Sequence, residues 1–168
     1  ATMNAVQDIT ANNLTAKTVT MIAGQDITAT VINASDTVSM TAGNNLTATT
    51  MDAVKGIDLT ATSGNMDLHN VTTTEGNITA NAGTDLSADT LAAVDMGLTT
   101  GQNITAENLV ASGSATMNAV QDITANNLTV ATTAMNAERD ITATGVKASD
   151  TVTMTAGNNL TATTVDAV

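Results

Sequence analysis

Apolar and polar residues alternate in short runs along the chain, most clearly within residues 36–54. Val38, Met40 and Ala42 occupy every second position, and the same spacing resumes at Leu46. A period of two is typical of a strand that buries one face. The abundance of Thr and Val also favours strands, because branching at Cβ restricts a side chain in a helix. The pattern therefore predicts many short β-strands.

Turn signals separate these runs at a nearly constant spacing. Gly43-Asn44 divides the two runs described above. Equivalent positions are expected at Val6, Gly24, Gly43, Gly64, Gly83, Gly101, Val120, Glu138 and Gly157, which are 18 to 21 residues apart. A fixed period of this length indicates a solenoid. We expect an all-β parallel β-helix (β-solenoid) of about nine coils, forming a single array over residues 1–168 without polar caps.

The chain also contains a longer repeat that spans several of these periods. Residues 1–15 are identical to residues 115–129, and residues 34–54 nearly match residues 148–168. Both pairs are offset by 114 residues, which corresponds to six coils. The chain therefore contains about one and a half copies of a six-coil super-repeat, and this regularity predicts a segment of a longer array.

The alternation also predicts which side chains fill the interior. The expected core residues are Met21, Ile27, Val38, Met40, Ala42, Leu46, Ala48, Met51, Met117, Ile123, Met135, Ile141, Met154 and Leu160. The fourth coil is irregular, because the stretch at residues 64–68 carries two extra residues. We expect a widened corner or a bulge there.

Composition supports a thin coil and excludes several classes of protein. The chain contains no Phe, Tyr, Trp, Pro or Cys, so it has neither the aromatic volume of a globular core nor a disulfide framework. The net charge of −12 disfavours binding to nucleic acid and to anionic membranes. No apolar stretch approaches the ~20 residues that span a bilayer, so we expect no membrane insertion.

A column of Asp and Asn precedes the buried Ile or Leu of successive coils: Asp8, Asp26, Asn45, Asp85, Asn103, Asp122, Asp140 and Asn159. We favour stacked side chains that form hydrogen bonds along the rod, as Asn ladders do. The alternative is a Ca²⁺ ion held between Asp8 and Asp26, or between Asp122 and Asp140, because stacked carboxylates repel one another. The preferred prediction is therefore no metal and no cofactor.

Two further patterns have alternative interpretations. Asn-x-Thr occurs at Asn13, Asn45, Asn70, Asn77, Asn103, Asn127 and Asn159, and each is a formal glycosylation acceptor, although Asp replaces Asn in other coils of the column. A Thr row follows the buried residue at Thr10, Thr28, Thr47, Thr105, Thr124, Thr142 and Thr161. Strand propensity on a wet face explains this row, and the alternative is an ice-binding β-solenoid.

Residues suited to catalysis are scarce. His69 is the only His and is expected at the surface, and there is no Cys nucleophile. A Met column at Met3, Met21, Met40, Met117, Met135 and Met154 favours core filling over a site for a soft metal. We therefore expect no enzymatic activity.

The run Gly-x-Asp/Asn-Ile/Leu-Thr-Ala, seen at 24–29, 43–48, 101–106 and 157–162 and with Ser87 at 83–88, resembles the repeats of the filamentous-haemagglutinin family. These large exoproteins are exported by two-partner secretion. The resemblance implies a right-handed parallel β-helix, located outside the cell or at its surface, that forms the shaft of an adhesin. It makes flanking coils or further copies of the chain the expected partners, with contact to a host or neighbouring cell made by regions outside this segment. A subunit that stacks end to end into an extracellular polymer is the alternative.

Overall fold

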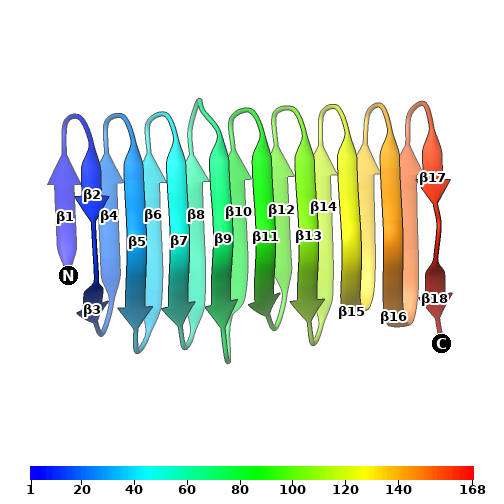
Figure 1. Ribbon diagram of the computed structural model, residues 1–168, viewed down its shortest axis with the longest axis horizontal. Helices are drawn as coiled ribbons and strands as arrows, with labels where there is room; N and C mark the ends of the chain where they lie inside the picture. Colours follow the sequence, from blue (N-terminus) through cyan, green and yellow to red (C-terminus); the bar gives the residue numbers. More distant parts are fainter.

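A computed structural model describes residues 1–168 as eighteen strands and no helix. All strands belong to one sheet, and every pairing between neighbours is parallel. Figure 1 shows the strands side by side along the long axis, with the two ends of the chain at opposite ends of the array. The expected β-solenoid of about nine coils is therefore confirmed. The structure contains no helix with the length and apolarity to cross a membrane.

Each coil has three faces, named here by their order along the chain. The first face is formed by β1 (Thr2–Ala5), β4 (Val19–Ala23), β6 (Thr37–Ala42), β8 (Gly56–Ala61), β10 (Asn77–Ala82), β12 (Met96–Thr100) and β14 (Ser114–Ala119). The second and third faces are formed by β5 (Ile27–Ala34), β7 (Leu46–Ala53), β9 (Met66–Thr73), β11 (Leu86–Ala93) and β13 (Ile104–Ala111).

The strands of the end coils differ from this scheme. In the first coil, β2 (Ile9–Ala11) and β3 (Leu14–Ala16) form the second and third faces separately, and β17 (Leu160–Ala162) and β18 (Val165–Ala167) do so in the ninth. The long strands β15 (Ile123–Ala137) and β16 (Ile141–Ala156) each continue onto the first face of the following coil.

The bend between the second and third faces interrupts the period of two. In β5, Thr30 and Val31 both point away from the core between the buried Ala29 and Ile32. At this bend Asn13 and Asn127 have φ of 52° and 42°, and Gly145 has φ of 71°. Asn and Gly are the residues that adopt this left-handed conformation most readily, so local sequence favours the bend in these three coils.

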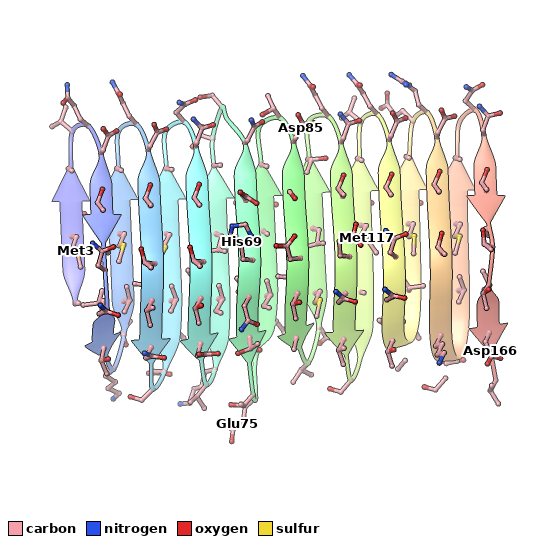
Figure 2. All side chains as sticks on the ribbon, in the orientation of Figure 1. Met3, His69, Glu75, Asp85, Met117 and Asp166 are labelled. Carbon is pink, nitrogen blue, oxygen red and sulfur yellow. The ribbon has the colours of Figure 1, made fainter.

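The register between neighbouring coils stacks similar residues on one another. One interior column contains Met3, Met21, Met40, Leu59, Ala80, Leu98, Met117, Met135 and Met154. The core consists of 48 buried apolar residues in one continuous cluster. Figure 2 labels Met3 and Met117, two members of this column. The favoured prediction of a Met column within the core agrees with this register.

Two of the expected core residues differ from the other twelve, which are buried. Leu160 is 52 % exposed and Met154 is only half-buried. Both lie in the ninth coil, and their inward register is correct, because Leu160 pairs with Ile141 and Met154 with Met135. The prediction that Leu160 is buried is wrong. The interior side chains of a coil are covered by the coils on both sides of it, and the ninth coil pairs only with the eighth in this structure.

The prediction for the fourth coil is correct about the two extra residues but wrong about their place. Ala61 pairs with Ala42, so the residue equivalent to Gly43 is Thr62 and not Gly64. The N–H of Thr62 donates to Ala42 O. One extra residue therefore lies in the corner at 62–65, and the other lies in the corner at 74–76, where Figure 2 shows Glu75 projecting from the rod. β9 pairs without a bulge on both sides, so the corners absorb both insertions.

A glycine is required at several of the first corners. Gly43 N–H donates to Ala23 O at 2.9 Å, and a Cβ added to Gly43 would lie 2.1 Å from Gly24 O. The close approach of one backbone to the next therefore leaves no room for a side chain at Gly43 in this conformation.

Candidate functional site

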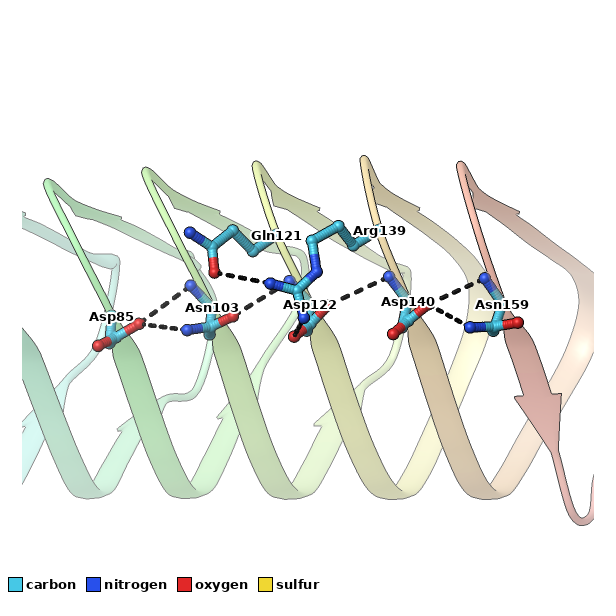
Figure 3. Close-up of polar contacts among 7 residues, drawn as sticks. All are labelled: Asp85, Asn103, Gln121, Asp122, Arg139, Asp140 and Asn159. Carbon is cyan, nitrogen blue, oxygen red and sulfur yellow. Dashed lines mark hydrogen bonds and ion pairs between the residues drawn. The ribbon is translucent and has the colours of Figure 1, made fainter.

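The most ordered polar feature is a ladder of nine side chains at the corner before the second face. It consists of Asp8, Asp26, Asn45, Asn65, Asp85, Asn103, Asp122, Asp140 and Asn159. In each step the Oδ1 atom of one residue accepts a hydrogen bond from the backbone N–H of the next, at 2.8 to 3.3 Å. Figure 3 shows the part of this ladder from Asp85 to Asn159. The predicted hydrogen bonding along the rod is confirmed.

Side-chain amides supply a second set of bonds in the ladder. The Nδ2 atoms of Asn45, Asn103 and Asn159 donate to Oδ1 of the Asp in the preceding coil, at 3.2, 2.8 and 3.0 Å. Each of these carboxylates therefore receives two donors from the next coil. Because a carboxylate oxygen can accept more than one N–H group, the mixture of Asp and Asn suits the ladder.

Two places bring carboxylates together without an Asn between them. At Asp122 and Asp140, the Arg139 Nη2 atom lies 3.1 Å from Asp122 Oδ2, and Arg139 Nη1 donates to Gln121 Oε1 at 3.4 Å (Figure 3). At Asp8 and Asp26, Asn44 Nδ2 donates to Asp26 Oδ1 at 3.0 Å. A guanidinium at Asp122 and an amide at Asp26 thus lie where the calcium alternative would place a cation.

The residues of the calcium alternative are therefore already engaged. Asp8, Asp26, Asp122 and Asp140 each offer Oδ1 to a backbone N–H of the next coil. No group of three or more His, Asp or Glu residues has the geometry to hold a metal ion. The arrangement fits a hydrogen-bonded ladder better than a ligand set, since Ca²⁺ takes six to eight oxygen ligands.

A second, shorter ladder lies at the corner before the first face. Asp95 N–H donates to Asn77 Oδ1 at 3.2 Å, and Asp95 Oδ1 accepts from Ser114 N–H at 2.7 Å and from Ser114 Oγ at 2.9 Å. The backbone N–H of Ser114, together with its hydroxyl, lowers the pKa of the Asp95 carboxyl below its ordinary value. This carboxylate therefore joins the sixth coil to the seventh in its charged form.

His69 lies at the surface, as expected, between two carboxylates. Its Nδ1 atom is 2.8 Å from Asp89 Oδ2 and its Nε2 atom is 3.9 Å from Asp67 Oδ2. The imidazole is 43 % exposed and projects outward from β9 (Figure 2). The contact between His69 and Asp89 therefore links the fourth coil to the fifth at the surface.

The Thr row of the second face is present but interrupted. Thr10, Thr28 and Thr47 stack in the first three coils, and Thr105, Thr124, Thr142 and Thr161 stack in the last four. Asp67 and Ser87 occupy this position in the fourth and fifth coils. An open groove of about 630 Å³ runs beside this interruption, bordered by the ladder residues Asp85 and Asn103. Asp67 and Ser87 therefore divide the row of Thr residues on which an ice-binding surface would depend.

Five of the Asn-x-Thr residues have side chains that are already hydrogen-bonded. Those of Asn45, Asn103 and Asn159 belong to the ladder, Asn77 accepts from Asp95, and Asn127 donates to Asn108. Asn13 and Asn70 remain exposed and without a side-chain hydrogen bond, so they are the acceptors with the least structural engagement.

Sequence reasoning missed Asn65 in the ladder and Arg139 beside it. Asn65 directly precedes Met66, as Asn45 precedes Leu46, but the register mark at Gly64 shifted the alignment. Arg139 could have been found from the sequence, because it directly precedes Asp140 as Gln121 directly precedes Asp122. Arg139 therefore stacks on Gln121, 18 residues earlier.

No model of a known protein family matches this chain. Searches of curated proteins and of solved structures likewise find no match. The resemblance to filamentous-haemagglutinin repeats therefore stays a prediction from the sequence pattern. What the structure establishes is a β-solenoid whose coils are joined by side-chain ladders.

Proposed function

We propose that this chain is a structural shaft segment of a secreted or cell-surface bacterial adhesin or extracellular filament. The observation that carries the proposal is the continuity of the ladder from Asp8 to Asn159, through all nine coils. Polar side chains that connect every coil to the next resist bending and fraying of a thin rod. Such an array holds two ends apart, which is the task of a shaft.

The distribution of charge supports the same role. Sixteen acidic residues against four basic ones keep separate rods from associating sideways, because like charges repel. The ladder and the outward faces of the strands hold many of the acidic groups, whereas the core is entirely apolar apart from Thr73, Thr100 and Thr133. The long sides are thus mutually repulsive, and the inward-facing apolar side chains are incompletely covered only in the first and ninth coils.

The test of a shaft is the dependence of its length on the number of coils. Two chains are compared by negative-stain electron microscopy, one with 168 residues and one carrying a further copy of residues 1–114 inserted after residue 114. The insertion keeps the super-repeat in phase. The proposal predicts rods of equal width, with a length that increases in proportion to the six added coils. Compact particles, or rods of unchanged length, would contradict it.

The exposed ends favour the second candidate, a subunit that stacks end to end. Leu160 and Val165 are 52 % and 44 % exposed on the ninth coil, and Met3 and Leu14 are incompletely covered on the first. Sedimentation velocity at rising concentration tests this candidate. Growth of the oligomers supports stacking, and a monomer at all concentrations removes it.

A further inference from the structure

The C-terminal edge of the rod has an internal duplicate that shows what covers it. Residues 150–168 repeat residues 36–54 with two differences, Ser39 to Thr153 and Met51 to Val165. In this chain residues 36–54 are covered by the fourth coil, and Leu46 is fully buried as a result, whereas its counterpart Leu160 is 52 % exposed. The edge at 150–168 therefore presents nearly the same surface that residues 36–54 present to the fourth coil.

The contacts of the fourth coil on residues 36–54 are specific. Ser63 Oγ donates to Gly43 O at 2.6 Å, and Asn65 N–H donates to Asn45 Oδ1 at 2.9 Å. Thr72 Oγ1 donates to Asp52 Oδ1. The acceptors on the C-terminal edge that correspond to these are Gly157, Asn159 and Asp166.

Charge and shape also distinguish the occupant. Lys55 Nζ lies 3.7 Å from Asp36 Oδ1, and Asp150 is the counterpart of Asp36. Gly64 fits closely over the preceding coil, because an added Cβ would lie 2.5 Å from Asn45 Oδ1. The occupant thus supplies a cation, two hydroxyl donors and a glycine at defined places.

The N-terminal edge is duplicated in the same way. Residues 1–15 are identical to residues 115–129, which lie on the sixth coil. There Asn126 Nδ2 donates to both Glu107 carboxylate oxygens at 3.1 Å, and Asp122 N–H donates to Asn103 Oδ1 at 3.2 Å. Asn12 and Asp8 are the corresponding residues at the edge.

From these two duplicates we infer that the edge at 150–168 is a docking surface for a coil with the sequence pattern of residues 55–73. The edge at residues 1–15 matches a coil with the pattern of residues 96–111. Both patterns belong to one block, residues 55–114, so the two edges match that block better than they match each other. This inference rests on the proposed shaft and specifies the order of coils within it.

The first coil of a second copy fits the C-terminal edge less well. Its corner between Ala5 and Ile9 has three residues where the fourth coil has four at 62–65, so it has no counterpart of Ser63. Two contacts are nevertheless kept, because Asp8 N–H is placed to meet Asn159 Oδ1 and Thr15 is placed to meet Asp166.

The test compares two extensions of equal length on the full chain. One chain carries a second copy of residues 55–114 after Val168, and the other carries a second copy of residues 1–60. Amide hydrogen exchange is measured within residues 157–168, with residues 43–54 of the same chain as the control for folding. We expect exchange in 157–168 to be slower by about tenfold in the first chain than in the second, because only the first rebuilds the native interface.

A third chain carries Gly64→Val in the appended copy of residues 55–114 only. The inference predicts that this change removes the additional protection of residues 157–168 and leaves residues 43–54 unaffected. Equal protection by the two extensions, or protection that survives Gly64→Val, would overturn the inference while leaving the shaft intact. If neither extension protects residues 157–168, coils do not stack on this edge, and the proposed shaft fails as well.

Discussion

Met3 and Met117 lie in identical stretches of fifteen residues, yet Met117 is fully buried and Met3 is only half-buried. Their difference cannot come from local sequence. It comes from the sixth coil, which covers the seventh, whereas residues 1–15 pair with the second coil alone in this structure. Burial in this protein is therefore a property of each pair of neighbouring coils, as expected for an array in which repeats contact only their neighbours.

This relationship predicts a large difference between two identical substitutions. Met117→Ala is expected to lower the free energy of unfolding by about 2 to 5 kcal/mol, the usual cost of truncating a buried Met. Met3→Ala is expected to cost less than about 1 kcal/mol, because Met3 is only partly covered by its neighbours. Urea unfolding followed by circular dichroism measures both. Equal costs would show that the coils do not bury one another as described.

The corner glycines allow a second matched comparison. Gly43→Ala places a Cβ 2.1 Å from Gly24 O, so the backbone of one coil must shift, at a cost of about 1 to 3 kcal/mol. Gly97→Ala, on a strand of the first face, meets no atom within 4 Å and is expected to be neutral or to stabilise by up to about 1 kcal/mol. Thermal unfolding of the two variants checks the signs. A stabilising Gly43→Ala would contradict the close approach of the corners.

The ladder predicts a difference between Asn45 and Asn159. Both donate an amide N–H to the Asp before them, but only Asn45 also accepts a backbone N–H, from Asn65. Asn45→Ala is therefore expected to cost about 1 kcal/mol more than Asn159→Ala, which is the typical net contribution of one hydrogen bond. Chemical denaturation of the two variants measures the difference. A greater cost for Asn159→Ala would argue against the ladder.

Asp95 predicts a dependence of stability on pH. Ser114 holds the pKa of the Asp95 carboxyl below its ordinary value of 3.8, so the folded state releases this proton more readily than the unfolded state. The stabilisation is present in full above the ordinary value and is lost as the pH falls from about 5 through 3.8 toward the lowered value.

The measurement is the free energy of unfolding of the parent chain and of Asp95→Asn between about pH 6 and pH 3. The stability of the parent is expected to fall more steeply on acidification than that of the variant, and Ser114→Ala is expected to reduce the slope of the parent by removing one donor. Identical slopes in the parent and in Asp95→Asn would mean that Ser114 does not stabilise the carboxylate.

Most of the fold could be predicted from the alternation of residues. Val38, Met40 and Leu46 are buried because a strand places every second side chain on one face, and the constant period required the coils to be similar. The position of the two insertions was not predictable in this way. Gly64 looks like the equivalent of Gly43, but the strand pairing shows that one of the two extra residues lies in the next corner. Corners on the surface tolerate an extra residue, whereas a strand that faces the core does not.

The ladder was partly predictable and the ends were not. A column of Asp and Asn at one place in each coil is visible in the sequence, and its hydrogen bonds follow from stacking at strand spacing. The exposure of Leu160 depends on the presence or absence of a neighbouring coil, which no local pattern encodes. Thr133 shows the opposite case, because a polar residue in the place of Val19 stays buried by donating its hydroxyl proton to Ala115 O at 3.0 Å.

The most direct test of stacked, mutually bonded coils is site-resolved amide hydrogen exchange at Asp8 and Asp122 in the monomeric chain. The two residues lie in identical stretches of sequence. Only the N–H of Asp122 donates to a ladder oxygen, which is Oδ1 of Asn103. The account predicts slow exchange at Asp122, close to the rate of global unfolding, and rapid exchange at Asp8. Equal rates at the two residues would contradict it.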